Sequence, residues 1–190
     1  MRLDRKLNFV IPVETDNGVL YVHTTPLSRE AFELYYLTIA QTFTKIYTQG
    51  ITLVAGPRVA YMTLKDVATQ NGVWEGPGGV ENGLIAETMR LSNVIMPVDK
   101  GWTTVPLEDA IAKSLLSVDD VDEVLGQVTF FTVASAMHKR TELPSVLGYV
   151  ASTWGAQLSG LNSTEFSNSL RTSTETANSG VKETRSPIPS

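Results

Sequence analysis

Two histidines are the first residues in this sequence whose type could support chemistry. His23 and His138 could each act as a general base or bind a metal through an imidazole nitrogen. Neither has a second histidine or a glutamate at the spacing that metal sites use. The two residues also fall on different predicted elements. We therefore interpret both as packing or surface histidines.

An acidic run is the strongest candidate for a metal site. It consists of Asp119, Asp120, Asp122 and Glu123 and follows Ser117, a favourable helix N-cap residue. A calcium loop needs a glycine-turned loop with alternating oxygen ligands, and this run has the pattern of a first helical turn instead. Negative charge there complements the helix dipole. The sequence predicts a helix start at this run and no bound metal.

The remaining signatures of catalysis or cofactor binding are weak. The glycine-rich loop from Trp74 to Gly79 could cradle a phosphate, but no Lys-Ser or Lys-Thr follows it and no clear strand precedes it. No serine lies in a Gly-x-Ser-x-Gly motif. The sequence has no cysteine, which excludes disulfides, thiolate chemistry and cysteine-bound zinc. We predict a protein that is not an enzyme and holds no cofactor.

Composition narrows the classes of partner. The 190 residues carry a net charge of -5, and the one basic cluster is Arg2, Arg5 and Lys6, interpreted as a solvated terminus. Phosphate binding requires clustered positive charge, so no nucleic-acid partner is expected. No apolar stretch approaches the length that spans a bilayer or forms a signal peptide. We expect a soluble cytoplasmic protein with no membrane partner.

A β-hairpin is predicted at residues 1–25. Residues 7–13 and 19–24 flank Asp16-Asn17-Gly18, and Asn-Gly provides the positive φ angles that tight hairpin turns need. Pro12 lacks an N–H group, which favours an edge position for the first strand. Two strands alone are marginally stable, so the hairpin must pack on the elements that follow.

Helices are predicted over most of residues 26–158. An aromatic-rich helix at 28–50 is the candidate for the central packing element. Residues 51–55 could be a strand or a buried connection. Further helices are predicted at 58–69, 81–93, 106–115, 117–138 and 144–154. The predicted fold class is mainly α (α+β), with the N-terminal hairpin packed on a bundle of about five helices.

The composition changes at residue 159. From there to residue 190, serine, threonine, asparagine and glycine dominate, and large apolar residues are few. Such a segment buries too little surface to offset its ordering entropy, although Asn162 to Glu165 could start a single helical turn around Phe166. We predict a flexible Ser/Thr-rich tail at 159–190 that orders on a partner.

Three stretches resemble the tail assembly chaperones of long-tailed bacteriophages with flexible tails. They are the helix start Leu27-Ser28-Arg29-Glu30, the block from Gly101 to Ser135 with Thr129-Phe130-Phe131-Thr132, and the run from Ser163 to Thr174. The resemblance implies a non-enzymatic assembly factor in the host cytoplasm. Such proteins coat the tape measure protein, help recruit tail tube protein and are usually absent from the finished virion. Many also exist as a frameshifted longer form.

Two other functions stay open. One is a virion structural protein, such as a tail completion or head-to-tail connector subunit, that would assemble as a homo-oligomer. The other is a metal-dependent hydrolase that uses the acidic run from Asp119 to Glu123. The resemblance and the weakness of the catalytic signatures favour the chaperone.

Overall fold

The computed structural model describes residues 7–16, 18–50, 56–139, 141, 142, 144, 145, 148, 151, 152 and 154–170. Their strands form one antiparallel sheet of five strands in the order β4-β3-β2-β1-β5. The strands are β1 (Asn8–Thr15), β2 (Gly18–Thr24), β3 (Ser92–Val98), β4 (Gly101–Pro106) and β5 (Gln157–Ser159). Most of the helices follow β2, before the chain returns to the sheet at β3.

The N-terminal hairpin is confirmed. Thr15 pairs with Gly18 at its turn, and Gly18 has the positive φ of 113° that favours glycine. β1 is not an edge strand in the sheet order, because β5 lies on its other side. However, β5 pairs only with Asn8, Phe9 and Val10. Pro12 therefore lies where the outer side of β1 is uncovered, as a residue without an N–H group requires.

The predicted mainly helical fold, a hairpin packed on a bundle of about five helices, is wrong. The hairpin is part of a larger sheet, because Ser92–Val98 and Gly101–Pro106 form a second hairpin that pairs with β2. The sequence analysis extended a helix to Asn93, but the helix ends at Arg90. The run that follows contains Val94, Ile95 and Val98, and a short apolar run of this kind fits a strand as well as a helix.

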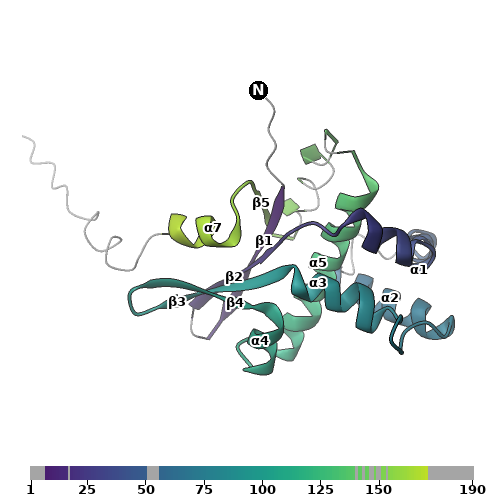
Figure 1. The fold of residues 1–190 in the computed structure, drawn as a ribbon, viewed down its shortest axis with the longest axis horizontal. Helices are drawn as coiled ribbons and strands as arrows, with labels where there is room; N and C mark the ends of the chain where they lie inside the picture. Colours follow the sequence, from purple (N-terminus) through teal and green to yellow (C-terminus); the bar gives the residue numbers. More distant parts are fainter. Residues whose placement is uncertain are drawn as a thin grey trace, which may run out of the picture.

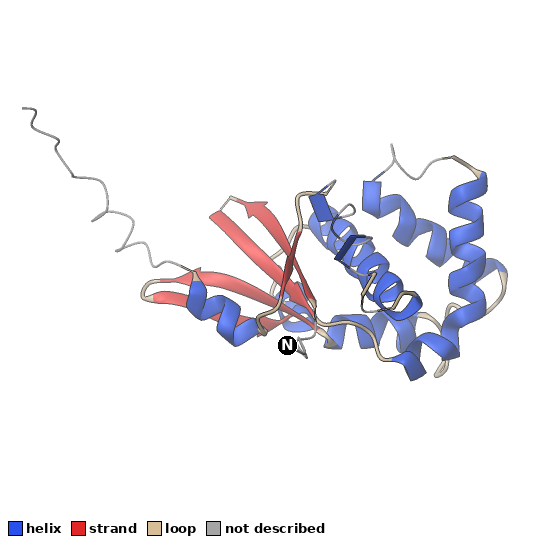
Figure 2. Cartoon of the chain, turned by 90° about the horizontal axis from the view of Figure 1, so that it is seen from above, coloured by secondary structure: helices blue, strands red, loops and turns tan. Residues whose placement is uncertain are grey.

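Most of the helices lie together at one end of the molecule (Figures 1 and 2). The helices are α1 (Arg29–Thr48), α2 (Gly56–Gln70), the π-helical turn η1 (Glu81–Ile85), α3 (Ala86–Arg90), α4 (Leu107–Ala112), α5 (Val118–Met137) and α7 (Ser163–Ser169). α7 is set apart from the others, beside the sheet. The predicted connection at 51–55 lies outside the described residues, and so does much of the helix predicted at 144–154.

α5 is the central helix of the fold. On one side it packs against the sheet, where the rings of Phe131 and Phe9 stack at 4.6 Å with an interplanar angle of 11°. On its other side it packs against α2, and Gly126 permits this approach, because an added Cβ would lie 2.1 Å from the Pro57 carbonyl oxygen. The sequence analysis assigned the central position to the aromatic-rich helix, now α1, and that assignment is wrong.

The opposite face of the sheet is covered by α7. Phe166 is buried there against Val10 and Ile95, and its ring meets that of Tyr21 edge-on at 5.6 Å. Asn162 caps the helix by accepting a hydrogen bond from the backbone N–H of Glu165. Within the stretch predicted as a flexible tail, Ser159 ends β5 and Ser163–Ser169 form α7. Residues 171–190 lie outside the described part of the chain.

Candidate functional site

The fold keeps the two histidines apart. His23 is buried in β2, and its Nε2 atom lies 2.9 Å from the Leu161 carbonyl oxygen, which also accepts a bond of 2.8 Å from Asn8 Nδ2. Burial lowers the pKa of His23 below its usual value of 6.5, and the bond to Leu161 opposes that effect. His138 lies at the end of α5, with Nδ1 3.9 Å from Glu142. His23 thus holds α7 to the sheet, as a packing histidine.

The acidic run begins α5, as predicted. Ser117 and Asp120 form a capping box, in which each side chain accepts a hydrogen bond from the other residue's backbone N–H. Arg58 bridges from α2 to Asp119 at 2.9 Å and to Asp122 at 3.5 Å. Within the described residues, no group of three or more histidine, cysteine, aspartate or glutamate side chains could hold a metal ion. The run therefore acts as a helix start and as a contact to α2.

The glycine-rich loop is built around a core residue. Trp74 is buried in the cluster between α1 and α2, where it meets the Tyr61 ring at 6.4 Å, and the Lys65 Nζ atom lies 5.4 Å from its ring centre. The loop turns back so tightly that a Cβ on Gly79 would lie 2.4 Å from the Trp74 carbonyl oxygen. Its glycines therefore serve the turn that places this tryptophan.

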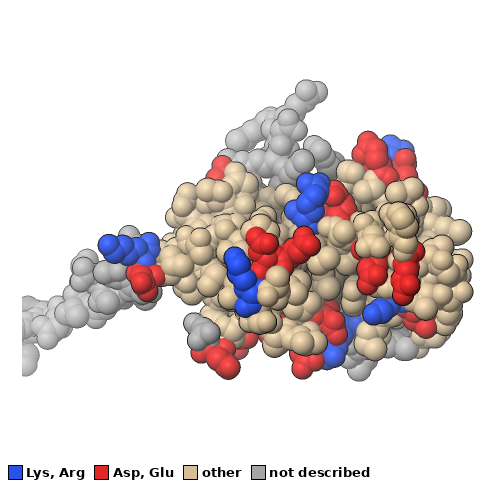
Figure 3. Space-filling view, turned by 60° about the horizontal axis from the view of Figure 1, so that its bottom comes forward, with Lys and Arg blue, Asp and Glu red and all other residues tan. Residues whose placement is uncertain are grey.

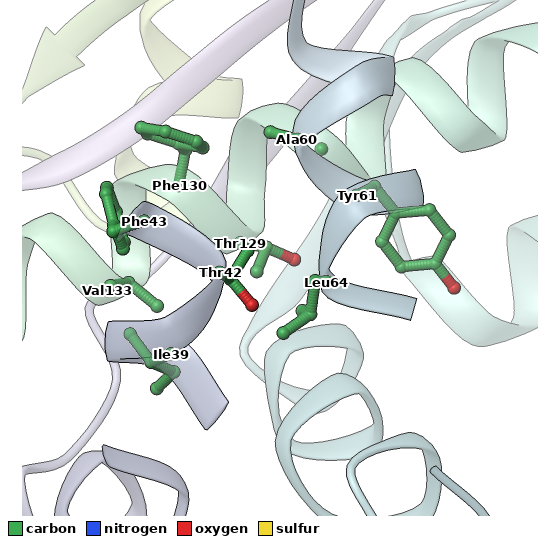
Figure 4. A pocket seen from close by; sticks show the side chains of 10 residues that line it. Ile39, Thr42, Phe43, Ala60, Tyr61, Leu64, Thr129, Phe130 and Val133 are labelled. Atoms are coloured by element: carbon green, nitrogen blue, oxygen red, sulfur yellow. The ribbon is translucent and has the colours of Figure 1, made fainter. Parts of the chain in front are cut away.

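A small apolar cavity lies where α1, α2 and α5 meet (Figure 4). Its volume is about 20 Å³, which is room for a single water molecule. The buried Thr129 hydroxyl at its wall has no hydrogen-bond partner. The lining residues are Ile39, Thr42, Phe43, Ala60, Tyr61, Leu64, Gly126, Thr129, Phe130 and Val133. We interpret the cavity as a packing gap, because it is too small for a ligand.

Three apolar side chains of α1 are exposed on the surface. Leu34, Tyr36 and Leu37 are exposed to 72%, 58% and 68%, and we call them the α1 ridge. Leu34 and Leu37 are three residues apart and share one face of the helix. On the other side of α1, Ile39 and Ile46 are buried. The helix therefore has two apolar faces, and the fold covers one of them.

The sequence analysis missed this ridge. The aromatic-rich helix at 28–50 was predicted as a packing element, but the Tyr36 ring is exposed, and the Phe32 ring lies edge-on to it with 6.0 Å between the ring centres. Leu34 and Leu37 were not singled out. Their spacing is the signal that was available, because two leucines three residues apart form a second stripe beside that of Ile39 and Ile46.

Charge on the surface is mixed. On the face shown in Figure 3, acidic and basic side chains lie close to each other, with uncharged surface between the groups. Ion pairs on the surface include Arg29 with Glu33 at 2.6 Å and Arg90 with Glu87 at 2.6 Å. Such exposed pairs contribute little to stability, so their main effect is on solubility.

The helices of the described chain include none with the length and apolar character needed to cross a bilayer. No protein-family model, no curated protein and no solved structure matches this chain.

Proposed function

We propose that this protein is a non-enzymatic tail assembly chaperone of a long-tailed bacteriophage, and that the α1 ridge binds the tape measure protein. The ridge is the observation that carries the proposal. A protein that holds a long apolar client must present apolar surface without collapsing onto itself, and α1 presents Leu34, Tyr36 and Leu37 from a helix that is fixed by its opposite face.

The shape of the ridge favours a helical client. Side chains at positions three apart on one helix fit between the side-chain rows of a second helix. A client helix with its own apolar stripe can therefore lie along α1 and cover Leu34 and Leu37 together. Burying a leucine side chain contributes about 1.5–3 kcal/mol before the costs of association are subtracted. A contact that contributes so little free energy is reversible. A chaperone that leaves the finished tail must release its client in this way.

The immediate surroundings keep the ridge soluble. Glu30 lies one turn before Leu34, Glu33 directly precedes Leu34 and pairs with Arg29, and Gln41 and Thr44 follow Leu37 on the exposed side of the helix. A small apolar centre with a polar rim is the usual composition of a reversible protein interface. Recruitment of tail tube protein and residence in the host cytoplasm belong to the same proposal and follow from the resemblance.

The test is co-expression with the product of the long gene immediately downstream, followed by size-exclusion chromatography and a stoichiometry estimate. We expect the downstream protein to be soluble only with this chain and to elute with several copies of it. The double variant Leu34→Ser/Leu37→Ser should lose most of the co-purified client while keeping its own melting temperature, because both side chains are exposed.

The matched control is Val98→Ser/Val118→Ser. These two valines are also exposed apolar residues, but they lie on the second hairpin and at the start of α5. The control should bind client like the parent chain. Equal loss in both double variants would contradict the ridge as the binding surface. A chain that ignores the downstream protein and is found in purified particles would instead support the virion structural protein.

A further inference from the structure

The second half of β1 has no neighbouring described strand on its outer side. β5 pairs with residues 8–10 of β1 and stops, and no other described strand pairs with the outer side of residues 11–15. Thr15 and Gly18 close a two-residue turn, and such a closing pair is hydrogen-bonded, so the odd-numbered residues of β1 face β2. The carbonyl group of Pro12, which has no N–H, and the N–H and carbonyl groups of Glu14 then face the open side. An unpaired edge of this kind is a template for another strand.

A crevice runs along this edge, between β1 and the first turns of α5. Its volume is about 220 Å³, enough for a long side chain and part of a backbone. Its carboxylates are those of Glu14, Asp120 and Glu123, and no lysine, arginine or histidine is among the described residues that line it. The complete lining is Ile11, Pro12, Val13, Glu14, Asp120, Glu123, Val124 and Gln127. We call this feature the acidic crevice.

Hydrogen-bond acceptors outnumber donors in the acidic crevice. Gln127 is 2% exposed, and its Nε2 atom makes a long contact of 3.5 Å with Glu123 Oε1. Its Oε1 atom is buried and has no hydrogen-bond partner in the described part of the chain. Carboxylates bind groups that only donate hydrogen bonds. The guanidinium group of arginine and the ammonium group of lysine are such groups. The crevice thus suits an extended segment that carries positive charge.

We propose that the acidic crevice takes residues 1–6 of a second copy of this chain. Arg2, Arg5 and Lys6 are the densest group of positive charge in the sequence, opposed there only by Asp4. The segment also alternates in polarity at Met1, Arg2, Leu3 and Asp4, the pattern of a strand with one apolar face. Added to the edge of β1, it would bring cations to the carboxylates and backbone groups to Pro12 and Glu14.

The position of β5 favours a second copy over the same chain. Residues 1–6 join β1 at Leu7, and β5 occupies the outer edge directly after that point, along Asn8 to Val10. Six extended residues reach about 20 Å, so the chain's own segment would have to reverse and cross β5 before it met the crevice. The segment of a second copy enters from solvent without that detour. This proposal does not depend on the proposed chaperone function.

The absence of cysteine permits a direct test. Two full-length variants, Arg5→Cys and Glu14→Cys, are purified separately, mixed and oxidised gently, and products are separated on a non-reducing gel. We expect a mixed disulfide dimer between the two variants. The control replaces Glu14→Cys by Glu75→Cys, an exposed glutamate on the glycine-rich loop. A yield no higher than that of the control would overturn the proposal.

Two further measurements separate the alternatives. A single chain with both Arg5→Cys and Glu14→Cys should give linked dimers, and a purely intramolecular disulfide would show that the segment folds onto its own chain. The charge-reversal variant Glu14→Lys/Glu123→Lys should raise the dissociation constant for self-association about tenfold in sedimentation, and high salt should weaken the parent. A parent chain that stays monomeric at every concentration would overturn the proposal and leave the crevice to a segment of another protein.

Discussion

Helices α1 and α5 are each 20 residues long and differ in what the fold does with them. α5 packs between the sheet and α2, and its residues from Val124 to Thr129 are all buried. α1 packs with one face only and presents Leu34 and Leu37 on the other. The comparison separates two uses of apolar surface. In α5 it stabilises the fold, and in α1 part of it is left available to a partner.

The largest effect is expected from Phe131→Ala. This ring is fully buried and stacks on Phe9, so its removal leaves a cavity between α5 and the sheet. We expect the free energy of unfolding to fall by about 3–5 kcal/mol, measured by urea denaturation. The matched change on α1, Tyr36→Ala, should cost less than about 1 kcal/mol because that ring is exposed. Similar losses in the two variants would remove the distinction between the helices.

A smaller loss is expected from Gly126→Ala. The added methyl group would meet the Pro57 backbone at the contact between α5 and α2, and backbone cannot rotate away as a side chain can. Overpacking of this kind costs about 1–3 kcal/mol, measurable as a lower melting temperature. Gly78→Ala is the control, because nothing lies within 4 Å of a Cβ there and its φ is not positive. Unchanged stability in Gly126→Ala would show that the two helices can separate.

The smallest effect on stability concerns His23, which holds α7 to the sheet. The folded chain keeps this imidazole neutral, with a pKa below 6.5, whereas the unfolded chain protonates it at the usual value. The unfolded state therefore binds more protons below about pH 6.5. The stability that the neutral, buried His23 contributes is fully present above that pH. It is lost as the pH falls toward the lowered pKa.

The free energy of unfolding must be compared between variants over the same pH range, because carboxylates also titrate in acid and change the stability of every variant. His23→Gln should flatten the decline in stability between about pH 7 and pH 5 relative to the parent chain. A parent and a His23→Gln variant with parallel pH profiles would contradict the buried neutral histidine.

Several elements were predicted correctly from residues that lie close together in the sequence. Ser117 and the acidic residues after it predicted the start of α5, and the capping box confirms that start. Asp16-Asn17-Gly18 predicted the first hairpin, and the pairing of Thr15 with Gly18 confirms it. In each case the residues that decide the structure are within a few positions of each other, so no knowledge of the rest of the fold was needed.

Elements that depend on distant partners were missed. β3 becomes a strand because Asn93 and Ile95 pair with His23 and Tyr21, about seventy positions earlier, and a short apolar run does not reveal that pairing. The same reasoning applies to α1. Its sequence contains two apolar stripes, and only the packed fold shows that the one with Ile39 is covered and the one with Leu34 is not.

The central claim is that the α1 ridge, and not the surface of α5, binds the client. Hydroxyl-radical footprinting of the chain alone and of the co-purified complex tests it, since Leu, Tyr and Val side chains all report their exposure. We predict that Leu34, Tyr36 and Leu37 lose reactivity in the complex, while Val118, which is 80% exposed, keeps its reactivity. Unchanged reactivity on α1 together with protection at Val118 would contradict the account.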